Sequence, residues 1–68
     1  MTVLELLMQL ADDTMIAISE YPSDLPEYVG TWKEVPDLMQ YECCVITDGI
    51  RFVNGFLHIK YIRLKGRV

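Results

Sequence analysis

The sequence has no apolar run near the roughly 18 residues that would cross a bilayer, although 51% of its 68 residues are hydrophobic. No lysine or arginine precedes Lys33, and Glu5 interrupts the first apolar stretch, so the basic start of a secretory signal is missing as well. We therefore expect a cytoplasmic protein. A chain of this length predicts a single domain over residues 1–68.

Cysteine and histidine are too few for an ordinary metal site. Cys43 and Cys44 are adjacent, and a bridge between neighbouring residues would be strained. Zinc prefers four ligands, and His58 is the single histidine that could join the thiols before carboxylates are needed. We expect two reduced thiols, no bound metal and no cofactor.

The sequence also offers little for catalysis. Ser19 and Ser23 are its only serines, its single histidine falls within a predicted strand, and no glycine-rich loop precedes a helix to hold phosphate. The adjacent acids Asp12 and Asp13 are typical of an exposed helix end rather than of a pair that shares a proton. We expect a protein that is not an enzyme.

Charge is divided along the chain. All ten acidic residues lie within residues 1–50, where Lys33 is the only base, whereas residues 51–68 hold five bases and no acid. Such separation favours binding to another macromolecule. The bases could pair with acids inside the fold, meet an acidic partner or contact nucleic acid, although a net charge of −4 is unusual for the last role. The nucleic-acid alternative would use Arg51, Lys60, Arg63 and Lys65.

The chain begins with a helix signal. Thr2 can cap a helix, and Glu5 three residues later completes a capping box, which predicts a helix that ends at Asp12-Asp13. Apolar residues would cover roughly 200° of this helix, whereas a surface helix needs a stripe of only a little over 100°. Either the following loops or another molecule must cover the remainder. Leu4 and Met8 are the helix residues that we expect at such an interface.

Three stretches and one turn predict the sheet. Residues 14–21 and 28–33 are rich in β-branched or aromatic side chains, and residues 42–46 follow a single helical turn at residues 35–39. Asn54-Gly55 predicts a C-terminal hairpin, because both central positions of a type I′ turn need positive φ. We expect an α+β fold with one N-terminal amphipathic helix packed on a small, mainly antiparallel sheet of four to five strands.

The hairpin also predicts which of its side chains are buried. A turn at Asn54-Gly55 pairs Val53 with Phe56 and puts alternate residues on one apolar face. Extending the same register would bury Asp48, so we expect a β-bulge near Asp48-Gly49. The buried face would comprise Ile50, Phe52, Leu57, Ile59 and Tyr61.

Aromatic residues offer a second candidate interface. Tyrosine and tryptophan are enriched where proteins meet, because they give a large contact area at a low entropic cost. In so small a domain most of them must instead belong to the core. We predict that Tyr28 or Trp32 contacts a partner, with core packing as the alternative.

Several short pieces of the sequence match a known pattern. They are Thr2-Val3, Glu5-Leu6-Leu7, Asp12-Asp13-Thr14, Gly30-Thr31, Val35-Pro36 with Leu38, residues 42–46 and Leu57-His58-Ile59. With these pieces the chain resembles short, mostly uncharacterised proteins of bacteriophages and mobile elements of gut bacteria. The resemblance implies a phage-like accessory role, and the small acidic proteins of that setting include inhibitors of bacterial defence such as anti-CRISPR proteins. It carries no catalytic or binding residues.

Together these patterns predict a non-enzymatic protein-interaction module that binds and modulates, or inhibits, a host or phage protein. We expect a homo-oligomer, with a dimer favoured, because a chain this short buries only about 60% of its unfolded surface and needs a further contact. The alternative is a small nucleic-acid-binding protein that uses the basic end. Neither prediction involves a membrane.

Overall fold

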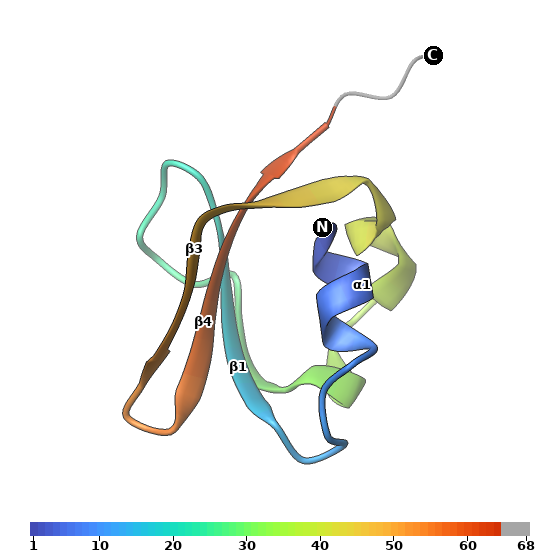
Figure 1. Cartoon of the computed structure of the whole chain (residues 1–68), viewed down its shortest axis with the longest axis vertical. Coiled ribbons are helices and arrows are strands. Elements are labelled where there is room, and N and C mark those ends of the chain that lie inside the picture. The colour runs from blue at the N-terminus through green and yellow to red at the C-terminus, as the bar shows by residue number, and fades with distance from the viewer. Residues whose placement is uncertain (65–68) are drawn as a thin grey trace.

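A computed structural model describes residues 1–64, apart from the side chain of Asp48. Within these residues, one four-stranded sheet has the order β2-β1-β4-β3, with parallel pairing at its centre and antiparallel pairing on both sides (Figure 1). The α+β class is confirmed, but the sheet is mixed, because β4 lies beside β1 and runs in the same direction. Its strands are β1 (Met15–Glu20), β2 (Tyr28–Thr31), β3 (Cys44–Val53) and β4 (Phe56–Arg63).

The helix α1 spans Val3–Leu7 and is shorter than predicted. Its start is as expected: the Thr2 hydroxyl accepts from the Glu5 N–H at 3.1 Å, and the Glu5 carboxylate accepts from the Thr2 N–H at 3.0 Å. Beyond α1 the N–H groups of Gln9 and Leu10 donate to carbonyls three residues back, so the chain tightens into turns. Asp12-Asp13 is therefore not the helix end.

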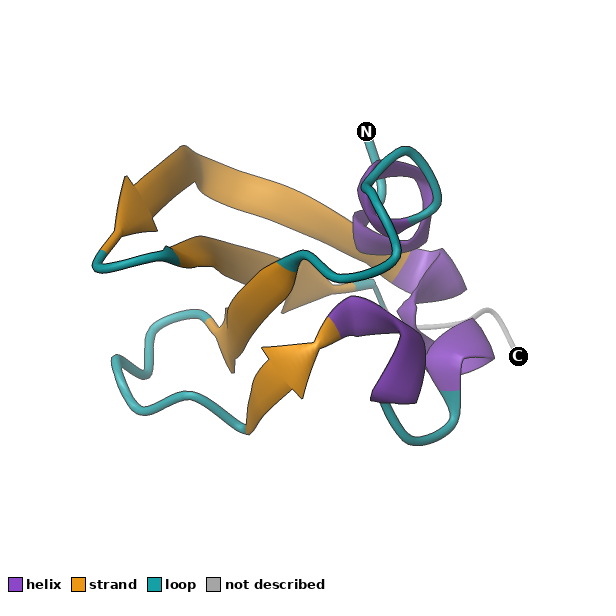
Figure 2. Cartoon of the chain, turned by 90° about the horizontal axis from the view of Figure 1, so that it is seen from below, coloured by secondary structure: helices purple, strands orange, loops and turns teal. Residues whose placement is uncertain are grey.

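The chain's own segments cover the apolar face of α1. Val3, Leu4 and Leu7 are buried, because α1 packs against the first part of β3 and against the 3₁₀ helix η2 (Leu38–Cys43). Figure 2 shows α1 and the other helical segments gathered at one side of the strongly curved strands. Of the two helix residues expected at an interface, Leu4 belongs to the core and Met8 is 67% exposed.

The second predicted strand ends early, at Thr31. Trp32 begins the 3₁₀ helix η1 (Trp32–Glu34) and turns its indole into the core, where the ring N–H donates to the Ala11 carbonyl at 2.8 Å. This bond satisfies the one polar group of a side chain that is otherwise buried among apolar neighbours. Trp32 is therefore a core residue rather than a surface contact.

The strands β3 and β4 meet at Asn54-Gly55, where both residues have positive φ and Val53 lies opposite Phe56. The register shifts between Thr47 and Ile50, so Asp48 and Gly49 are additional residues in β3. The expectation of a fully buried hairpin face is wrong. Ile59 and Tyr61 are buried and Leu57 is partly buried, but Ile50 is 40% and Phe52 is 69% exposed, because α1 packs only on the first part of β3.

The packing of α1 predicts different costs for two neighbouring truncations. Leu7→Ala should lower the free energy of unfolding by about 2–5 kcal/mol, because it leaves a cavity in a closed core. Met8→Ala should change it by no more than about 0.5 kcal/mol, because this side chain faces solvent. Urea denaturation followed by circular dichroism measures both. Equal losses would contradict this account of the helix.

Candidate interaction site

The outer edge of β3 has two halves, and the first is covered by the chain itself. Thr2 forms a bridge with Val45, and the Ile46 N–H donates to the Met1 carbonyl at 3.3 Å. Met1 and Thr2 thus pair with Val45 and Ile46 at this half of the edge. These contacts blunt this half of the edge against pairing with other molecules.

The second half, residues 50–53, is named here the open edge. In a two-residue hairpin the pairs Val53–Phe56 and Arg51–His58 exchange hydrogen bonds between their backbones. The N–H and C=O groups of Ile50 and Phe52 consequently point away from β4. Within residues 1–64 no further strand lies on that side of β3, so these groups are available to an incoming strand.

Apolar side chains accompany these backbone groups. Ile50 and Phe52 lie on the same face of the hairpin as Leu57, which is partly buried, and Val53 is 43% exposed on the opposite face. Exposed, apolar edge strands tend to pair with other chains, and natural proteins usually blunt them. The open edge therefore offers both the backbone groups and the apolar side chains that strand addition requires.

Polar side chains occupy the opposite, outer face of the hairpin. Arg51 lies opposite His58, and Lys60 lies beside Ser19 of β1. They border a depression of about 110 Å³, named here the outer depression. The Lys60 ammonium donates to the Asp24 carboxylate at 2.6 Å, and this contact lowers the pKa of Asp24. The depression is lined by Ser19, Asp24, Gly49, Arg51, His58, Ile59 and Lys60.

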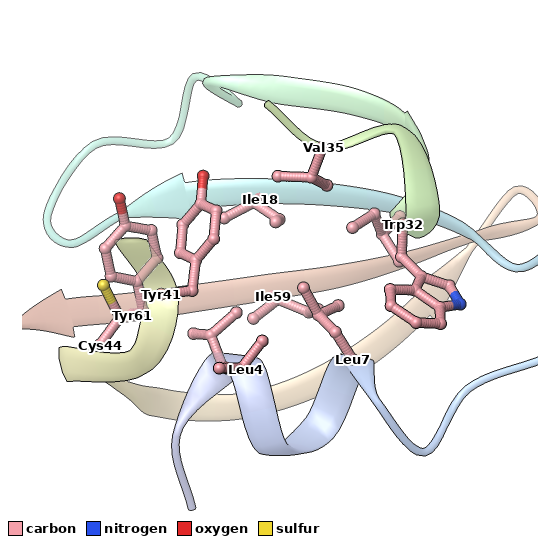
Figure 3. Close-up of a cluster of buried hydrophobic side chains, with 11 residues drawn as sticks. Leu4, Leu7, Ile18, Trp32, Val35, Tyr41, Cys44, Ile59 and Tyr61 are labelled. Atoms are coloured by element: carbon pink, nitrogen blue, oxygen red, sulfur yellow. The ribbon is translucent and has the colours of Figure 1, made fainter. Parts of the chain in front are cut away.

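A buried tyrosine pair joins three segments of the fold. The Glu27 carboxylate accepts from the Tyr41 hydroxyl at 2.6 Å and from the Tyr61 hydroxyl at 2.9 Å. The two rings are nearly perpendicular, with centroids 5.6 Å apart, and Figure 3 shows their hydroxyl groups side by side. Arg63 donates to the Tyr61 oxygen at 3.0 Å. The cluster ties the loop before β2 to η2 and to the end of β4.

The chemistry of this cluster is structural. Burial, together with the nearby Glu27 carboxylate, raises the pKa of Tyr41 and of Tyr61, so both phenols stay protonated at neutral pH. Burial also raises the pKa of the Cys44 thiol, which leaves little of the reactive thiolate. No sequence pattern identified Glu27, because its two partners are 14 and 34 residues away.

The structure does not bring the four predicted contact residues to one exposed surface. Leu4 and Trp32 are buried. Tyr28 is partly buried, and its hydroxyl donates to the Thr31 carbonyl at 2.6 Å. Met8 alone among the four is well exposed.

The predicted nucleic-acid residues are divided between two faces. Arg51 and Lys60 border the outer depression, whereas Arg63 contacts Tyr61 and the Gln40 carbonyl on the inner side of the sheet. Lys65 lies outside the described residues. The three described cations therefore do not form one continuous basic surface.

Comparisons with protein-family models, with curated proteins and with solved structures found no match. The described part of the chain holds no group of three or more histidine, cysteine or acidic residues placed to bind a metal. No helix within residues 1–64 has the length and apolar character needed to cross a membrane.

The tyrosine pair predicts a loss of stability at alkaline pH. A phenol whose pKa is raised by folding stabilises the protein below its unfolded pKa of 10.0, and this stabilisation is lost as pH rises above that value. The free energy of unfolding should therefore fall more steeply above about pH 10 in the original protein than in Tyr41→Phe. Denaturation at a series of pH values measures this slope. Parallel curves would show that Tyr41 ionises equally in both states.

Proposed function

We propose that the chain is a non-enzymatic protein-interaction module that binds an extended segment of another protein along the open edge. One observation carries this proposal: Ile50 and Phe52 present outward-facing backbone groups and exposed apolar side chains at the same edge. Main-chain hydrogen bonds would supply affinity, and the side chains on either face would supply selectivity.

The charge around the open edge indicates the kind of segment. Successive side chains of an added strand point to opposite faces of the sheet. Those on the inner face would meet Ile50 and Phe52, and those on the outer face would meet Arg51, with His58 and Lys60 on the next strand. A segment of alternating apolar and acidic residues fits both faces.

A second copy of the chain fits this edge less well. Pairing Ile50 with Phe52 of another copy would place the two Arg51 side chains directly opposite one another, and like charges in that position are destabilising. The dimer prediction depended on the short length of the chain and on the wide apolar face of its helix. Of that face, Val3, Leu4 and Leu7 are buried within the chain and Met8 is exposed. The peptide titration therefore treats self-association at the open edge as an outcome distinct from peptide binding.

The biological setting in this proposal comes from the sequence resemblance. A phage-like accessory protein that modulates or inhibits a host or phage protein could use such an edge to occupy a partner's strand or peptide site. Among residues 1–64, Arg51 and Lys60 are the two predicted nucleic-acid residues that share a face, because Arg63 lies on the other side of the sheet.

A capped peptide of eight residues with alternating valine and glutamate tests the proposal. Titration into the ¹⁵N-labelled protein should shift the amide signals of Ile50 and Phe52, and a valine-lysine peptide should bind more weakly because it meets Arg51. Phe52→Ser should weaken binding by about tenfold or more, which corresponds to a loss of about 1.4 kcal/mol in binding free energy. The matched control is Leu25→Ser, an exposed apolar residue of the loop before β2.

Each outcome of this titration is decisive. Shifts at Ile50 and Phe52 that are lost in Phe52→Ser support strand addition. Shifts that change with protein concentration when no peptide is present would show instead that a second copy of the chain binds at the open edge. Equal binding by Phe52→Ser and Leu25→Ser, or no shift at the open edge, would overturn the proposal.

A further inference from the structure

We propose that the outer depression is a binding site for a single phosphate-type oxyanion. It lies on the face of the sheet opposite α1, where β1, β3 and β4 run side by side. This site goes beyond the proposed function, because it takes a small anion and does not require a partner strand. The two sites share Arg51, but the depression does not use the apolar side chains of the open edge.

The register of three strands brings the donors together. Arg51 of β3 lies directly opposite His58 of β4, and Ser19 of β1 lies beside Lys60 of β4. Since directly paired residues have Cβ atoms about 5 Å apart, their side chains can reach one small ligand. Donors fixed on strands hold their geometry better than donors on loops.

The size of the depression suits one small anion. Its volume of about 110 Å³ gives room for a single phosphate-sized group. Gly49 lies on its wall with φ of +74°, and no atom lies within 4 Å of the position that a Cβ would take there. A ligand can therefore approach the backbone of β3 at this point.

The Asp24 carboxylate is itself an oxyanion bound by Lys60 at the border of the depression. This carboxylate contacts the Lys60 ammonium at 2.6 Å, yet the Asp24 side chain is 89% exposed, so the ion pair is well screened and weak. A phosphate group carries more charge than a carboxylate, and it could engage the Arg51 guanidinium through two parallel hydrogen bonds. We expect the incoming oxyanion to compete with Asp24 for Lys60.

A single phosphate group fits this arrangement better than a nucleic-acid backbone does. A backbone needs cations in a row, with several phosphates neutralised along the track. Here Arg51 and Lys60 border one depression that also contains the acidic Asp24, and Arg63 lies on the inner side of the sheet. The ligand class is therefore inorganic phosphate or a phosphate monoester.

The test is a titration of the ¹⁵N-labelled protein with sodium phosphate, with sodium chloride at equal ionic strength as the blank. Phosphate should shift the amides of Gly49, Arg51 and Lys60. Arg51→Gln should weaken binding by about fivefold or more, because it removes a charge-assisted contact. Asp24→Asn should strengthen binding by a similar factor, because it removes the competing carboxylate. A parallel titration with phosphoserine distinguishes a monoester from the free ion.

Two further variants serve as controls. Lys33→Gln removes an exposed cation that pairs with Asp12 outside the depression, so it should leave phosphate binding unchanged. Phe52→Ser should also leave it unchanged, which separates this site from the open edge. The proposal is overturned if Arg51→Gln and Lys33→Gln weaken binding equally, if Asp24→Asn does not strengthen it, or if chloride produces the same shifts.

Discussion

The two additional residues Asp48 and Gly49 divide β3 into a first half that packs in the core and a second half that is exposed. Both the open edge and the outer depression depend on this division. Before these two residues, β3 packs against α1, and its residues Val45 and Ile46 pair with Met1 and Thr2. Beyond them, β3 bends and continues with β4 as a projecting hairpin (Figure 1). Ile50 and Phe52 consequently leave the core and expose both side chain and backbone.

Closure of the core depends on polar as well as apolar contacts. The buried cluster contains Leu7, Ile18 and Ile59 together with Tyr41 and Tyr61. The exposed residue Glu27 accepts from both tyrosine hydroxyls at the margin of this cluster. The pair of phenols gives the small domain a large buried area while satisfying each hydroxyl. The chain's own segments cover α1, and the exposed apolar side chains of Ile50 and Phe52 lie on the hairpin instead.

Local signals in the sequence were the most informative. The capping box of Thr2 and Glu5 could be predicted because it depends on residues three apart. The parallel pairing of β1 with β4 and the role of Glu27 could not, because the partners are distant in sequence. Alternation placed Phe52 and Ile59 on one face correctly but could not tell that Ile59 would be buried and Phe52 exposed.

The availability of the open edge is tested most directly by amide hydrogen exchange in the isolated protein at low concentration. The amides of Arg51 and Val53, which face β4, should exchange at least about a hundredfold more slowly than those of Ile50 and Phe52, which face solvent. Equal protection of all four amides would show that another segment or another copy already covers this edge, and would contradict the account.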